Sequence, residues 1–179
     1  MKLFKSNQLK KLMISLLSFF TIQFFILNYE ITFASNLPKV TYTIEGNTSI
    51  GNNIKVNINI SNVTDLYGYS VDFLYDPTII KINSIDAGNI FGSLNPIKAV
   101  NIVDNNSGQS NIALTLKGDI KGVSNTGTLA VINATVLKSG KLNIKTISNN
   151  DPLSLTGSTI RVKLSDSNAK AISYTAETK

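Results

Sequence analysis

Between residues 39 and 164 the chain is a succession of short segments rich in Ile, Val, Thr and Tyr, separated by Gly, Asn, Asp and Ser. Two of them, 54–60 and 69–75, alternate apolar and polar residues, as a strand does when one face lies in a core. No segment has convincing helical spacing. Such short strands and turns are typical of an all-β fold, a two-sheet sandwich. The pattern predicts about nine strands: Lys39–Glu45, Asn53–Ile60, Tyr67–Tyr75, Ile79–Ile85, Lys98–Val103, Ser110–Leu116, Thr128–Leu137, Lys141–Ile147 and Ser158–Leu164.

Residues 1–34 differ from the rest of the chain and predict a secretory signal peptide. Several lysines precede the apolar stretch Leu12–Leu27, and Thr32-Phe33-Ala34 then offers small residues to a signal peptidase. The stretch is shorter than the roughly 20 residues that cross a bilayer, although an uncleaved membrane anchor stays an alternative. We therefore expect a protein secreted by, or displayed on, a bacterium. The remaining residues, 35–179, are predicted to form a single domain.

Composition excludes several classes of chemistry. The chain contains no Cys, His or Trp, so thiol nucleophiles, histidine-based triads, disulfides and the usual zinc sites are impossible. The formal net charge of +6 is scattered, without basic runs interleaved with aromatic residues, which argues against a nucleic-acid partner. A glycosidase built on carboxylates is disfavoured because no Trp is available for a sugar cleft. We expect no enzyme, no catalytic residue, no metal and no cofactor.

The order of several short motifs resembles that of cohesin domains from cellulosome-type assemblies. Tyr75-Asp76-Pro77 ends one predicted strand, and an Ile79-Ile80 pair opens the next. The turn 86–90 (DAGNI) and the Gly-initiated strand 127–136 (GTLAVINATV) then follow in the order found in that family. The resemblance implies a jelly-roll-like sandwich that acts as a non-catalytic docking module. Its partner is expected to be the dockerin module of secreted glycoside hydrolases.

Strand alternation, combined with this resemblance, predicts which residues face the partner. The inward rows are expected to include Tyr69 to Tyr75, Ile112 to Leu116 and Ala130 to Val136, each at every second position. In cohesins, polar recognition residues precede Tyr-Asp-Pro at positions that here hold Gly68 and Ser70, so Asp72 is the substitute candidate. The strands are expected to be neighbours that share one outward face. The predicted partner-binding residues are Ser70, Asp72, Thr115, Leu129, Val131 and Asn133.

Three alternatives stay open. The first is a carbohydrate-binding module of related sandwich fold. The tyrosines argue against it, because Tyr67, Tyr69 and Tyr75 lie on the same side of one strand and cannot all form an exposed platform if that side faces the core. The second is a surface adhesin that self-associates through an edge strand. The third is a calcium loop at 104–108 (DNNSG), for which a hairpin turn is the simpler interpretation because further ligands are missing.

Overall fold

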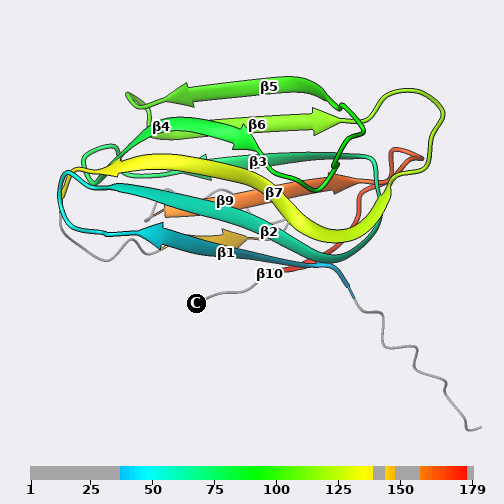
Figure 1. The fold of residues 1–179 in the computed structure, drawn as a ribbon, viewed down its shortest axis with the longest axis horizontal. Coiled ribbons are helices and arrows are strands. Elements are labelled where there is room, and N and C mark those ends of the chain that lie inside the picture. The colour runs from blue at the N-terminus through cyan, green and yellow to red at the C-terminus, as the bar shows by residue number, and fades with distance from the viewer. Residues whose placement is uncertain (1–36, 139–143, 148–157, 177–179) are drawn as a thin grey trace, which may run out of the picture. The chain divides into compact units, whose positions relative to one another are not determined.

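The computed structural model describes residues 37–138, 144–147 and 158–176. Within these ranges the chain forms ten strands, arranged as two five-stranded sheets that face each other (Figure 1). The first sheet has the order β10-β1-β2-β7-β4, and the second has the order β5-β6-β3-β9-β8. The predicted all-β sandwich is therefore confirmed. The strands are β1 (Lys39–Gly46), β2 (Asn53–Leu66), β3 (Gly68–Leu74), β4 (Ile80–Ala87), β5 (Ile97–Asp104), β6 (Gln109–Thr115), β7 (Val123–Val136), β8 (Ile144–Ile147), β9 (Ser158–Ser165) and β10 (Thr175–Ala176).

The core lies between the sheets and follows the predicted alternation closely. In β3 the side chains of Tyr69, Val71 and Phe73 are buried, and in β6 those of Ile112 and Leu114 are buried. The inward row of β7 from Ala130 to Val136 is likewise buried, as predicted. Burial of such Val, Ile, Leu and Phe side chains contributes about 1.5–3 kcal/mol each, which makes this layer the main source of stability.

Two long strands, β2 and β7, extend beyond the prediction, and β7 begins at Val123 rather than at Thr128. The strand expected to end at Ile60 continues to Leu66, because two residues with positive φ, Asn62 and Asp65, form irregularities inside β2 rather than ending it. Each is held by β7: the amide of Asn62 donates to Thr126 Oγ1 at 3.1 Å, and the amide of Asp65 donates to the Ser124 hydroxyl at 3.0 Å. The predicted end of the strand was wrong because the polar residues after Ile60, among them Asn62 and Asp65, resemble a turn in the sequence. The two-residue strand β10 was not predicted.

A bulge in β7 changes the orientation of one predicted site residue. Ile58 of β2 pairs with Ala130, but Asn59 pairs with Thr128, so Leu129 is the extra residue between them. Leu129 and Ala130 therefore both point into the core, and Leu129 is fully buried. The prediction that Leu129 faces outward is wrong, because simple alternation fails at a bulge.

Three exposed carboxylates, which we call the turn carboxylates, stabilise connections between strands. The largest effect on each comes from a side-chain hydroxyl: Ser167, Thr78 and Ser107, respectively, donate to Asp65, Asp76 and Asp104, and backbone amides add to this. These donors hold the pKa of each carboxyl below its usual value. The segment Asp104–Gly108 is thus a hydrogen-bonded turn, as the sequence predicts.

Candidate functional site

The six predicted partner-binding residues do not share one face. Ser70 and Asp72 lie on β3 and Thr115 lies on β6, all in the second sheet. Val131 and Asn133 lie on β7, in the first sheet, and buried Leu129 lies there too. The outer faces of two stacked sheets point in opposite directions, so the expectation of one shared surface is wrong. The strands β3 and β6 are neighbours in the second sheet, whereas β7 belongs to the first.

The outer face of the second sheet carries a row of four paired side chains, which we call the central row: Ile102, Asn111, Asp72 and Arg161. Asp72 is in register with Asn111 of β6 on one side and with Arg161 of β9 on the other. Asn111 is in turn opposite Ile102 of β5. The row therefore crosses four strands and passes from an apolar end, through an amide and a carboxylate, to a guanidinium.

Asp72 is the hydrogen-bonding centre of this row. Arg161 donates to Asp72 Oδ2 from Nε at 3.1 Å and from Nη2 at 2.9 Å. The Asn111 amide donates to Oδ1 of the same carboxylate. The Asp72 and Arg161 side chains are each about one-fifth exposed, so water screens their attraction less than on an open surface. Asp72 is consequently fixed in place, and it orients the two residues beside it.

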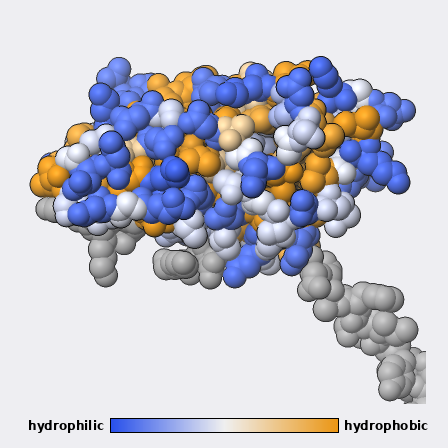
Figure 2. Space-filling model, viewed as in Figure 1, coloured by the Kyte–Doolittle hydropathy of each residue, from blue (hydrophilic) through white to orange (hydrophobic). Residues whose placement is uncertain are grey.

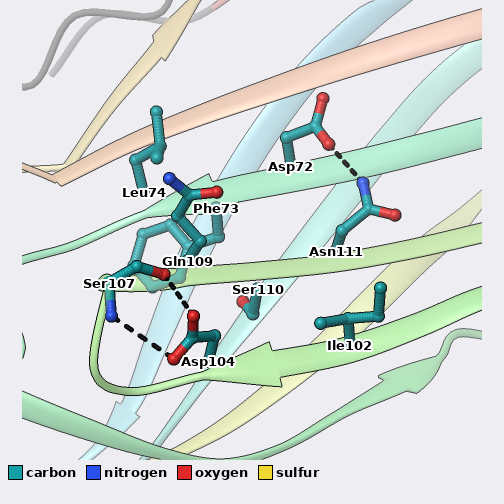
Figure 3. Close-up of a pocket in the computed structure, with 9 residues that line it drawn as sticks. All are labelled: Asp72, Phe73, Leu74, Ile102, Asp104, Ser107, Gln109, Ser110 and Asn111. Atoms are coloured by element: carbon teal, nitrogen blue, oxygen red, sulfur yellow. Dashed lines mark hydrogen bonds between the residues drawn. The ribbon is translucent and has the colours of Figure 1, made fainter.

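Two hollows flank the central row. On one side, the small-residue hollow, of about 300 Å³, has Ser70, Ala113 and Gly68 among its lining and Lys163 at its side. On the other side, the apolar hollow, of about 210 Å³, lies between Leu74 and Ile102. Figure 3 shows this apolar hollow with Asp72 and Asn111 joined at one end and the Asp104–Ser107 turn at the other. Side chains of a partner that enter both hollows would fix its position across the central row.

Polar side chains cover the outer face of the first sheet, and they hydrogen-bond to one another. The Asn133 amide donates to Ser84 Oγ at 2.9 Å and to Asp86 Oδ2 at 3.2 Å. The Thr135 hydroxyl donates to Asn53 Oδ1 at 2.8 Å. In the orientation of Figure 2, in which β7 and β2 lie in front of β9, hydrophilic residues are spread over much of the visible surface. Among the described residues, the only exposed large apolar side chains that lie on strands are Ile97 and Ile102 of the second sheet, so the first sheet offers no such anchor and is the poorer docking surface.

The tyrosines of β3 and its following turn are part of the core. Tyr69 and Tyr75 are both about 5% exposed, which leaves no row of exposed aromatic rings on this strand. Burial raises the pKa of the Tyr75 hydroxyl to about 12, with a smaller effect from the Asp104 charge. Flat glycans bind to exposed aromatic rows, so these tyrosines do not support the carbohydrate-binding alternative.

The residues that the structure describes give no support to a metal site or to a membrane-spanning helix. No group of three or more acidic side chains there is placed to hold a metal ion. No helix there has the length and apolar character of a membrane span. The predicted signal peptide, residues 1–34, lies outside the described residues.

Sequence reasoning missed three members of the central row: Ile102, Asn111 and Arg161. Alternation already places Arg161 on the outward side of its strand, because Ile160, Val162 and Leu164 are the apolar positions. The missing information was register, since Asp72 and Arg161 are 89 residues apart in the chain.

Comparison with known proteins finds a matching family model and solved structures of similar fold. A family model described as the cohesin domain matches residues 39–174. No curated protein matches the sequence significantly. The second type II cohesin module of the adaptor scaffoldin ScaA from Acetivibrio cellulolyticus has a TM-score of 0.57 and 21% identity, with 78% of this chain and 86% of that chain covered.

Two further solved structures are similar. The sixth cohesin of scaffoldin B from Acetivibrio cellulolyticus, solved in complex with a Cel5 dockerin, has a TM-score of 0.56 and 17% identity, and covers 79% of this chain and 94% of its own. A non-cellulosomal cohesin from the archaeon Archaeoglobus fulgidus has a TM-score of 0.55 and 13% identity, and covers 78% and 86%. At these identities the structural likeness shows the fold.

Proposed function

Since this chain belongs to the cohesin domain family, we propose that it is a non-catalytic docking module that binds dockerin modules of secreted enzymes. The proposal is supported by a similar cohesin that was solved in complex with a dockerin. We further propose that the enzymes carrying these dockerins are glycoside hydrolases. We also propose that residues 1–34 direct export and are removed, which places the docking module outside the cytoplasmic membrane.

The central row is the single observation that carries the choice of docking surface. It presents an exposed apolar side chain, Ile102, and a fixed polar group, Asp72, on either side of Asn111, and a hollow flanks the row on each side. Protein interfaces concentrate their binding energy in such places, where a few anchors are surrounded by contacts that exclude water. We therefore assign docking to the outer face of the second sheet. Of the residues predicted from sequence, Ser70, Asp72 and Thr115 remain in this proposal.

Calorimetric titration of the full chain against every dockerin module encoded in the same genome tests this function. At least one module is expected to bind with a Kd of about 1 μM or tighter. Absence of binding by the whole panel contradicts the docking function. Co-sedimentation with insoluble polysaccharide is the matched control, and binding there without binding to any dockerin favours the carbohydrate-binding alternative.

The export proposal has a separate test. The intact mass of the protein recovered from the culture medium is expected to lack residues 1–34. A recovered mass that still includes them supports the uncleaved membrane anchor instead.

A further inference from the structure

The outer face of the second sheet is basic along one border. Lys163 of β9 is exposed, lines the small-residue hollow and is in register with Ser70. Lys145 of β8 is exposed and pairs with Thr159, two residues before Arg161, so strand alternation places it on the same face. Within the described part of the chain, neither lysine forms an ion pair, whereas Arg161 is neutralised by Asp72. Among the described residues, the border formed by β8 and β9 therefore carries positive charge that no ion pair neutralises.

The opposite border of this face is apolar. On β5, Ile97 is 50% exposed and Ile102 is 57% exposed, although both belong to residue types that are usually buried. They share this edge strand with the small residue Ala99, which lines the hollow opposite Lys163. The strand order places β6 and β3 between the two borders, and three strand spacings of about 4.8 Å separate β5 from β9 by about 14 Å. A single partner element can therefore reach both borders at once.

We propose that the partner's contact surface is acidic where it lies over β9 and apolar where it lies over β5, with Lys163 and Ile102 as specificity-determining residues. The proposal rests on the docking function above and states the chemistry of the partner that this chain accepts. A carboxylate entering the small-residue hollow meets the Lys163 ammonium, which forms no ion pair with any residue that the structure describes. An apolar partner side chain covers Ile102 and removes its exposed surface from water.

Charge complementarity predicts a specific dependence on salt and on Lys163. The probe is the tightest-binding dockerin of the genome-encoded panel, titrated at about 0.05 M and about 0.5 M NaCl, where the Debye length falls from about 14 Å to about 4 Å. Wild-type affinity is expected to weaken with salt. Lys163→Glu is expected to weaken binding about tenfold at low salt and to remove most of the salt dependence. Lys163→Gln should lie between the two.

Matched variants on other surfaces separate this effect from general ones. Lys81→Glu makes the same charge change on an exposed residue of β4, in the first sheet, and should leave the Kd within about twofold. Ile102→Asn is expected to weaken binding about tenfold, whereas Ile50→Asn, at an exposed turn before β2, should not change it. Circular dichroism and the thermal midpoint verify the fold of every variant.

The outcomes distinguish this inference from the function on which it rests. If the wild type binds a dockerin while Lys163→Glu and Ile102→Asn behave like their controls, the acidic and apolar partner surface is wrong and the docking function stands. Tighter binding by Lys163→Glu also overturns the inference, because it indicates a basic partner. If the wild type binds no dockerin in the panel, both proposals fall together.

Discussion

The Asp72–Arg161 ion pair is expected to stabilise the folded chain through a measurable coupling between the two side chains. Both nitrogens of Arg161 that contact the carboxylate approach the same oxygen, at 3.1 and 2.9 Å. Both side chains are about one-fifth exposed, which places the pair between an open surface and a core. The Asn111 amide holds the other carboxylate oxygen, so Asp72 loses little further side-chain entropy when it pairs with Arg161.

The expected magnitude follows from these positions. At 2.9 Å the Coulomb energy of two unit charges is about 1.4 kcal/mol in bulk water and about 6 kcal/mol at an effective dielectric of about 20. Partial desolvation of both groups offsets most of the larger figure, and exposed pairs measured by mutation contribute about 0.2–1 kcal/mol. A half-buried pair with a third hydrogen-bonding partner should exceed that range modestly. We expect a coupling energy of about 1–2 kcal/mol.

A double-mutant cycle measures this coupling directly. The free energy of unfolding in urea is determined for the wild type, Asp72→Ala, Arg161→Ala and the double variant. Each single variant leaves one charge without its partner, so the two losses should sum to more than the loss in the double variant. A coupling within about 0.3 kcal/mol of zero, which is the usual limit of additivity, refutes the reasoning and makes the pair a surface contact of no energetic weight.

Three other predictions concern the fold that positions this face. Leu129→Asp should unfold the sandwich, because it buries a charge at the bulge, whereas Val131→Asp should keep a native circular dichroism spectrum; a folded Leu129→Asp protein contradicts the inward assignment. The turn carboxylates have pKa values below their usual range, so their contribution to stability is present above about pH 4 and is lost as the pH falls through the folded pKa values. The thermal midpoint should therefore decrease as the pH is lowered from about 4, and it should decrease less steeply in Asp65→Asn. Gly108→Ala should lower the free energy of unfolding by about 2 kcal/mol or more, since φ is +69° and the added Cβ lies 2.2 Å from the Tyr75 carbonyl oxygen; an unchanged urea midpoint shows that this turn can shift at no cost.

Much of the fold can be predicted from sequence because strand alternation is a local property. In β3, the apolar residues Tyr69, Val71 and Phe73 are spaced by two and all face the core. The turn residues between strands are equally local, since Asp and Asn side chains bind backbone amides two or three residues away. These features need no knowledge of which strands are neighbours.

The errors arise where a residue's orientation depends on another strand. Asn62 and Asp65 resemble turn residues, and only the hydroxyls of β7 allow the strand to continue through them. Leu129 breaks alternation because β2 pairs with the residues on both sides of it. Nothing in the local sequence distinguishes such a bulge from a regular strand, since each residue type is compatible with both.

The candidate site depends even more on pairing between distant strands. The sequence predicts that Asp72 faces outward. Its fixed orientation on the proposed docking surface, however, depends on hydrogen bonds from Asn111 and Arg161, which lie 39 and 89 residues away in the chain. The strand β3 lies between β6 and β9 in the second sheet. In each of these three strands, alternate residues face outward while the residues between them form a buried row. Outward positions such as Lys163 can therefore be substituted at little cost to the core. It follows that substitutions on the outer faces of β5 and β9 can change which partner this chain prefers while the sandwich stays the same. The charge on β9 and the exposed apolar area on β5 are therefore the properties from which partner preference is best predicted.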